Sequence, residues 1–171
     1  MPENKSYIKN MELIGYHDLK DRPGFQMAAQ VVDGRYYLYV SHFRHSGWTI
    51  LEVTDPASPR FVRFLEGPDL VGQVTNKIQV ADGLMLCALG TGIPFLHGIA
   101  SDDPYIAGLH IYDVKTDPEN PKFLSYWNAG EAQACDNICL GVHRFFYSGG
   151  RYAHLSSTCD GYSNMIYRIL D

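Results

Sequence analysis

The sequence predicts an all-β chain built from repeated units of four short strands, and three observations lead to this prediction. Asp-Gly and Gly-Gly pairs, which favour tight turns, separate runs of β-prone residues. A motif with a central isoleucine, followed by an Asp-Pro turn, recurs about every sixty residues. No window holds apolar residues at helical spacing together with helix caps.

The predicted third strand of each unit carries the clearest repeat. Residues 47–53 (GWTILEV) and 108–114 (GLHIYDV) both lead into a turn that contains Asp-Pro, and residues 167–171 repeat the start of the pattern. The shared isoleucines are 61 and 58 residues apart, at Ile50, Ile111 and Ile169. A fixed period of this length indicates a repeat architecture.

The predicted first and second strands of each unit form a hairpin. Residues 31–40, 79–88 and 146–155 resemble one another and have Asp-Gly or Gly-Gly near the middle. Glycine adopts positive φ without steric cost, so these pairs suit the two-residue turns of hairpins.

The predicted fourth strands, residues 60–65 and 122–127, alternate polar and apolar side chains after a proline. The units therefore span about 24–67, 73–130 and 141–171, within a single domain over residues 1–171. Residues 10–17 resemble the fourth strands, and we expect them to form a closing outer strand.

Four-stranded units at this period predict a β-propeller with about three blades, and a β-sandwich is the alternative fold. Propellers typically have four to eight blades, which leaves two explanations. The chain is a piece of a longer propeller, or two copies form a six-bladed homodimeric ring. The first is favoured here because repeat arrays need capping units and this pattern stops within a motif.

The motif also resembles the LVIVD-repeat proteins, a β-propeller family. The resemblance rests on residues 50–59 and 111–121 and covers about residues 11–171. It implies the propeller fold and leaves the activity open, because propellers serve as enzymes, binding modules and scaffolds.

Composition and charge exclude several classes of protein. The net charge of −5 offers no basic surface for nucleic acid. Residues 83–101 carry no Asp, Glu, Lys or Arg, but their glycines and Pro94 favour a strand and a loop over a membrane span. The N-terminus has no apolar signal region, so we expect a cytoplasmic protein.

Polar residues at the predicted channel are the candidate site. His143 is a candidate acid or base, and Arg144 could bind the carboxylate of an anionic substrate through two hydrogen bonds. The candidate substrate-binding residues, from the predicted first and second strands, are Gln26, Asn76 and His154. The alternative role for Arg144 is an ion pair with Asp136 or Asp160.

Histidines also raise the hypothesis of a divalent metal such as zinc. His42 and His45 form an H-x-x-H pattern, and His143 could supply a third nitrogen. The pattern lacks a third ligand at fixed spacing, so the alternative is histidines that form hydrogen bonds in loops. Cys135 and Cys139 precede His143, but their spacing is not that of a zinc ribbon, which favours structural cysteines.

Two classes of function follow. The first is an enzyme that acts on a small organic substrate in the channel, with metal assistance from the histidines as one version. The second is a non-catalytic scaffold for a protein partner, with aromatic anchors such as Tyr105 and Trp127. We favour the enzyme, because polar residues at a channel are costly unless they are used.

Overall fold

The computed structural model describes residues 10–130, 141–162 and 164–171. Three antiparallel sheets, named sheets 1, 2 and 3 in chain order, make up these residues. Sheet 1 consists of β1 (Gly24–Val32), β2 (Arg35–His42), β3 (Gly47–Glu52) and β4 (Arg60–Glu66). Sheet 2 consists of β5 (Gln73–Ala81), β6 (Leu84–Thr91), β7 (Gly108–Asp113) and β8 (Lys122–Asn128). Sheet 3 consists of β9 (Val142–Phe146), β10 (Ala153–Ser157) and β11 (Ile166–Leu170).

Each sheet is a meander, in which every strand pairs with the next one along the chain. The all-β prediction is confirmed, since the one helix in the described part of the chain is the single turn α1 (Pro94–His97). The predicted fourth strands are confirmed as β4 and β8. In the described residues no helix is long and apolar enough to cross a bilayer, and residues 83–101 hold β6 and α1.

The Asp-Gly pairs make the tight hairpin turns that the sequence predicts. Asp33 and Gly34 have φ of 49° and 76°, and Asp82 and Gly83 have φ of 51° and 76°. Two successive positive φ values define the turn that matches the twist of a hairpin. The third hairpin is looser, because β9 and β10 are separated by residues 147–152.

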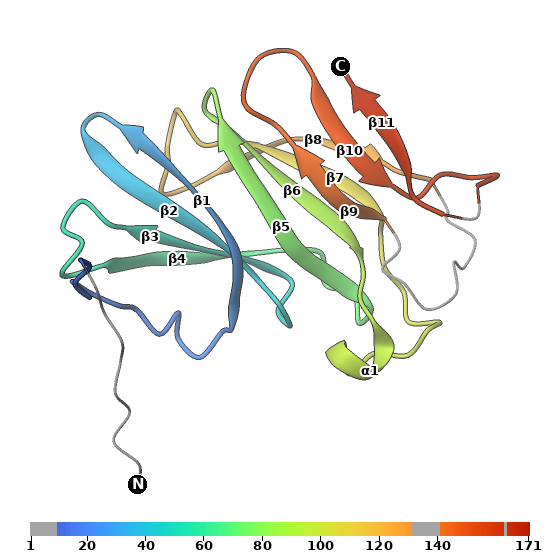
Figure 1. Ribbon diagram of the computed structural model, residues 1–171, viewed down its shortest axis with the longest axis horizontal. Coiled ribbons are helices and arrows are strands. Elements are labelled where there is room, and N and C mark those ends of the chain that lie inside the picture. The colour runs from blue at the N-terminus through green and yellow to red at the C-terminus, as the bar shows by residue number, and fades with distance from the viewer. Residues whose placement is uncertain (1–9, 131–140, 163) are drawn as a thin grey trace, which may run out of the picture.

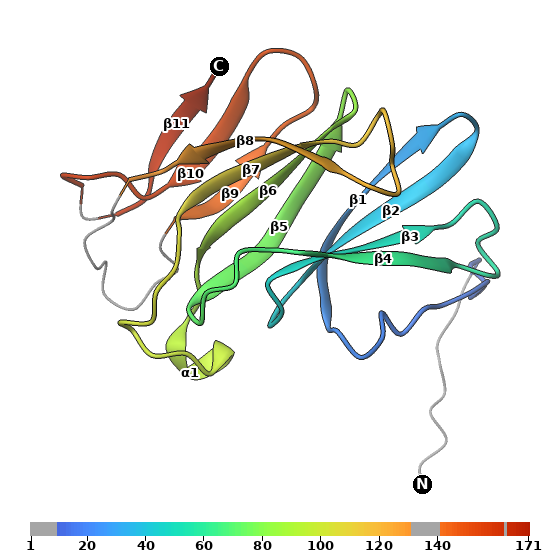
Figure 2. The same ribbon diagram turned by 180° about the vertical axis from the view of Figure 1, so that it is seen from behind.

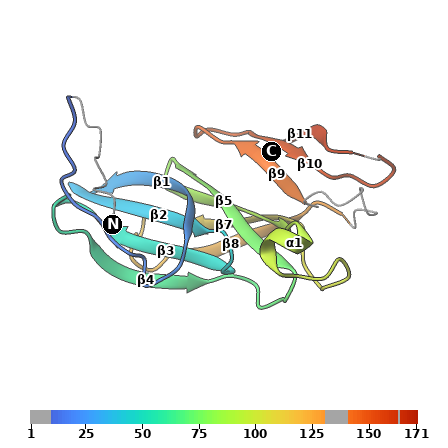
Figure 3. The same cartoon turned by 60° about the horizontal axis from the view of Figure 1, so that its bottom comes forward.

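The three sheets stand in a row, with sheet 2 between sheets 1 and 3 (Figures 1 and 2). Figure 3 shows the same row from another side, with α1 beside β5. Aromatic and aliphatic side chains such as Tyr39, Trp48 and Met85 fill the core between sheets 1 and 2. A second core, which includes Leu86, Leu109 and Leu155, joins sheets 2 and 3.

The first strands of the sheets, β1, β5 and β9, are neighbours in the row: β1 contacts β5, and β5 contacts β9. Glutamine side chains on two of these strands bond to the next sheet. Gln30 Nε2 donates to Val114 O at 2.7 Å, and Gln79 Nε2 donates to Phe145 O at 2.8 Å. Tyr147 N–H also donates to Gln79 Oε1, so the amide of Gln79 satisfies two backbone groups of sheet 3.

The N-terminal segment differs from its prediction. Residues 11–18 form no strand, and sheet 3 has three strands in the described part of the chain. The segment instead runs beside sheet 1, where Gly15 lies against the backbone of Pro56 and Ala57 and the His17 ring stacks on Phe61 at 6.0 Å. Within the described residues of one chain this segment therefore lies along sheet 1 and does not pair with β11, and the closing outer strand stays a prediction.

Candidate functional site

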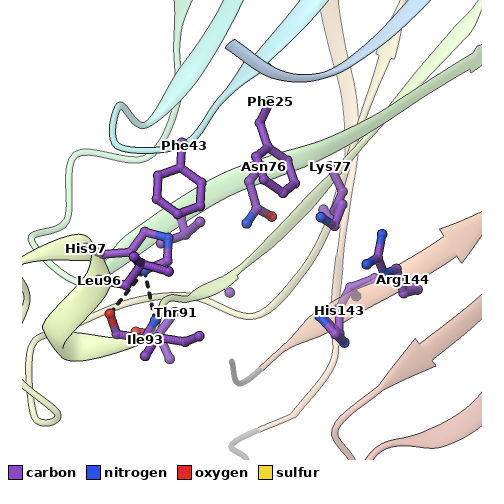
Figure 4. Close-up of a pocket in the computed structure, with 14 residues that line it drawn as sticks. Phe25, Phe43, Asn76, Lys77, Thr91, Ile93, Leu96, His97, His143 and Arg144 are labelled. Atoms are coloured by element: carbon purple, nitrogen blue, oxygen red, sulfur yellow. Dashed lines mark hydrogen bonds between the residues drawn. The ribbon is translucent and has the colours of Figure 1, made fainter. Parts of the chain in front are cut away.

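A cavity of about 160 Å³ lies where the first strands of all three sheets begin, next to α1 (Figure 4). Its lining comes from β1, β5, β6, β9, α1 and the loop that follows β2. The polar side chains in this lining include Asn76, Lys77, His97, His143 and Arg144. A space of this size holds a few water molecules or a small organic molecule, and a polymer would not fit inside it.

A β-bulge occurs in each of the three first strands at the cavity. In β1 the bulge holds Phe25 and Gln26 between two regular pairs. In β5 it holds Thr75 and Asn76, and in β9 it falls at His143. Because a bulge changes the direction of side chains along a strand, the repeat aims one side chain of each sheet, namely Phe25, Asn76 or His143, at the same space.

One wall of the cavity is aromatic. The rings of Phe25 and Phe43 stack with centroids 5.4 Å apart, and Phe43 lies 4.5 Å from the His97 ring. Figure 4 shows the Phe43 and His97 rings side by side next to α1. Such a wall suits a flat apolar group, because aromatic rings favour offset stacking.

Two cationic side chains also line the cavity. Lys77 is 4% exposed, and its ammonium group lies on the aromatic wall, 4.0 Å from the centroid of the Phe25 ring. Arg144 is exposed and lines the cavity from β9. No Asp or Glu occurs among the described lining residues. The guanidinium of Arg144 beside apolar side chains favours an anion there.

His143 is half-buried between these cations. Burial lowers the pKa of its imidazole, and the charges of Arg144 and Lys77 lower this pKa further. The ring is therefore neutral at neutral pH and has a lone pair that can accept a proton or a hydrogen bond. A neutral imidazole beside an anion-binding wall has the chemistry of a general base.

His97 presents a ring nitrogen without a partner. Its Nδ1 lies 2.9 Å from Ile93 N and 3.1 Å from Ile93 O, so the backbone of Ile93 holds this nitrogen in either tautomer. Its Nε2 is buried and has no hydrogen-bond partner among the described residues. A buried polar atom without a partner is costly, so a polar group bound in the cavity would stabilise this ring.

The structure brings three of the predicted site residues together, namely Asn76, His143 and Arg144. Gln26 is not in the cavity lining, and its backbone exchanges hydrogen bonds with Ser41 Oγ. His154 lies on the outward face of sheet 3, where its Nδ1 is 2.8 Å from Tyr167 Oη.

The predicted metal site is not found. Within the described residues, no group of three or more His, Cys, Asp or Glu side chains could hold a metal ion. His42 is fully buried, with Nδ1 3.2 Å from Pro23 O and Nε2 2.8 Å from Thr49 Oγ1. Because the carbonyl can only accept, Nδ1 carries the proton and Nε2 uses its lone pair on Thr49. His42 therefore has no lone pair for a metal, although His45 lies near it at a ring distance of 6.1 Å.

The predictions for Cys135, Cys139 and Asp136 fall on residues 131–140, outside the described residues. Of the described cysteines, Cys87 is buried in the core between sheets 1 and 2. Burial raises the pKa of the Cys87 thiol well above its ordinary value, so this residue is an inert apolar side chain.

The aromatic and cationic lining residues Phe25, Phe43, Lys77 and His97 were among those missed from the sequence. Two of them carried a usable signal, because Phe25 and Lys77 adjoin the predicted residues Gln26 and Asn76 at the start of first strands. Phe43 and His97 both follow a second strand, so the loop after that strand in each unit was the remaining signal.

Comparison with known proteins assigns no family, since no family model, no curated protein and no solved structure matches this chain. The resemblance to LVIVD-repeat proteins therefore stays a prediction.

Proposed function

We propose that the cavity binds a small organic anion with a flat apolar group, and that His143 accepts a proton there. The observation that supports this most is the meeting of aromatic rings and an arginine in one small space. Phe25 and Phe43 offer aromatic surface, and the exposed Arg144 offers a guanidinium.

Each side chain then has a distinct role. Arg144 binds the carboxylate or phosphate through two parallel hydrogen bonds, for which its guanidinium is suited. The Asn76 amide donates a hydrogen bond to the remaining oxygens of the ligand, and His97 Nε2 is a second polar contact for it.

The role of His143 makes this an enzyme proposal. A bound anion would hold a proton-bearing atom of the substrate near a neutral imidazole, which is the arrangement of general-base catalysis. The anchors predicted for the scaffold alternative, Tyr105 and Trp127, are both partly buried. The Trp127 ring is also covered by the Arg168 guanidinium at 4.7 Å.

We also propose how the three sheets are related. We take them to be blades of a β-propeller, with the cavity at one end of its central channel. Three features support this: each sheet is a meander, the first strands are neighbours, and the bulges recur at one position of the repeat.

Calorimetric titration with benzoate tests the anion site. We expect benzoate to bind, and benzamide, which has the same shape without the charge, to bind at least tenfold more weakly. Arg144→Gln should weaken benzoate binding about tenfold, the equivalent of about 1.4 kcal/mol. Arg63→Gln is the matched control, because Arg63 is an exposed arginine on β4 that bonds to Asn120.

Benzoate binding that is unchanged in Arg144→Gln would contradict the proposal. So would equal affinities for benzoate and benzamide, because the site would then recognise only the ring.

A further inference from the structure

Sheet 3 exposes the face that sheets 1 and 2 bury. Gly47 and Gly108 open β3 and β7 with φ of 140° and 147°, so Trp48 in β3 and Leu109 in β7 hold the same place in the repeat. Both are 0% exposed, since the next sheet in the row covers them. Their counterpart in β11 is Tyr167, which is 67% exposed.

The neighbouring position of the repeat shows the same contrast. Ile50 is fully buried, whereas Ile169 is 54% exposed. We call Phe146, His154, Tyr167 and Ile169 the outer face of sheet 3. Nothing in the described chain covers this face in the way that sheet 2 covers sheet 1.

Sheet 1 has the opposite face open. The pairing register makes Ile78 of β5 the counterpart of Met27 of β1. Ile78 is 0% exposed because sheet 1 covers it, whereas Met27 is 58% exposed. We call Met27, Ala29 and Val31 the outer face of sheet 1. The outer face of sheet 3 thus corresponds to the face of sheet 1 that packs on sheet 2. The outer face of sheet 1 corresponds to the face of sheet 2 that packs on sheet 1.

The edge of sheet 3 is open as well. β11 pairs with β10 on one side, and no strand pairs with its other side in the described chain. A cavity of about 360 Å³ lies between sheets 2 and 3 beside this edge, and Leu109, Ile111, Trp127 and Leu170 are in its lining. An apolar cavity next to an unpaired strand edge is a place for one more strand.

The N-terminal segment has the properties of that strand. Met11, Leu13, Ile14 and Tyr16 are all exposed. Gly15 of this segment touches the turn at residues 55–59 of sheet 1. β4 makes the corresponding contact with the turn at residues 117–121 of sheet 2, where Arg60 Nη2 donates to Glu119 Oε1 at 2.6 Å.

The segment therefore lies beside sheet 1 in the same way that β4, the outer strand of sheet 1, lies beside sheet 2. It occupies the position that the outer strand of a sheet before sheet 1 would have. The connecting chain is also equal in length. Residues 18–23 link this segment to β1, as residues 67–72 link β4 to β5.

We propose that two copies of this chain form a closed ring of six sheets. The outer face of sheet 3 of one copy packs on the outer face of sheet 1 of the second copy, and residues 10–17 of the second copy pair with β11. A second copy is the partner that fits, because this chain carries both halves of a packing that it already uses between its own sheets. A two-fold axis repeats the contact, so that both outer faces and the edge of β11 are covered in each copy.

Sedimentation equilibrium of the full chain over a range of concentrations tests the ring, and it is independent of the anion site. We expect twice the mass of one chain. Ile169→Asp places a charge in the contact and Leu13→Asp places one on the exchanged strand, and each should shift the mass to that of one chain. Both side chains are largely exposed in the single chain, so circular dichroism should show that these variants remain folded.

Leu124→Asp is the matched control, because Leu124 is an exposed leucine on β8 that the ring leaves in solvent. This variant should keep the double mass. A wild-type chain that is folded and monomeric at every concentration would overturn the proposal, and so would a double mass that persists in Ile169→Asp and Leu13→Asp.

Discussion

Histidine side chains in this protein differ in what their surroundings allow. His42 is held by Pro23 and Thr49 inside sheet 1, whereas His143 lies in a cavity between two cations. The same residue type therefore has a structural role at one position and a proposed chemical role at the other. The sequence could place His143 at the start of a first strand and His42 at the end of a second strand, but only the three-dimensional contacts separate the two roles.

Buried histidines should make the stability depend on pH. Burial lowers the pKa values of His42, His110 and His143 below the ordinary value of 6.5. As pH falls below about 6.5, the unfolded chain takes up protons that the folded chain resists, so the free energy of unfolding decreases. Urea denaturation at several pH values between about 7.5 and about 5 measures how steeply the free energy of unfolding depends on pH. This range extends about one unit or more on each side of the ordinary histidine pKa.

His42→Gln should reduce this slope, because one of the three histidines with a lowered pKa is then absent from both the folded and the unfolded chain. A slope in His42→Gln that equals the wild-type slope would contradict this assignment.

Strands and turns were the elements that local sequence could predict. Asp33-Gly34 and Asp82-Gly83 specify tight turns through their backbone preferences alone, and β4 and β8 follow from their alternating pattern. The bulges at Asn76 and His143 were not predictable, because a bulge depends on how two strands align. The burial of Lys77 and the position of His97 result from packing between sheets, which one sequence does not show.

Gly108, which starts the third strand of sheet 2, should tolerate substitution less well than Gly34 in the first hairpin. A Cβ on Gly108, which has φ of 147°, would overlap the carbonyl oxygen of Trp127, whereas a Cβ on Gly34 would meet nothing within 4 Å. Gly34→Ala therefore costs only the strain of positive φ, about 1 kcal/mol. Gly108→Ala also forces β7 and β8 apart and should cost about 3 kcal/mol.

Thermal or urea denaturation of the two variants checks this order. Equal losses in Gly34→Ala and Gly108→Ala would show that the backbone angle alone matters and that the close approach of β7 and β8 does not.

The row of three sheets explains, at the scale of the whole molecule, why a site forms where it does. Repetition of one meander brings the starts of β1, β5 and β9 together, and the repeated bulge brings their side chains into one cavity. The composition and the repeat could predict the sheets and three residues of the candidate site. They could not predict the aromatic wall, because Phe25 and Phe43 meet only after β1 and β2 pair.

The central claim is that this cavity binds an anion beside a neutral His143. Nuclear magnetic resonance of the His143 ring, titrated with pH in the absence and presence of benzoate, tests it most directly. A bound carboxylate stabilises the imidazolium, so we expect benzoate to raise the pKa of His143 and to bind more tightly as pH falls. Identical titration curves with and without saturating benzoate would contradict the claim.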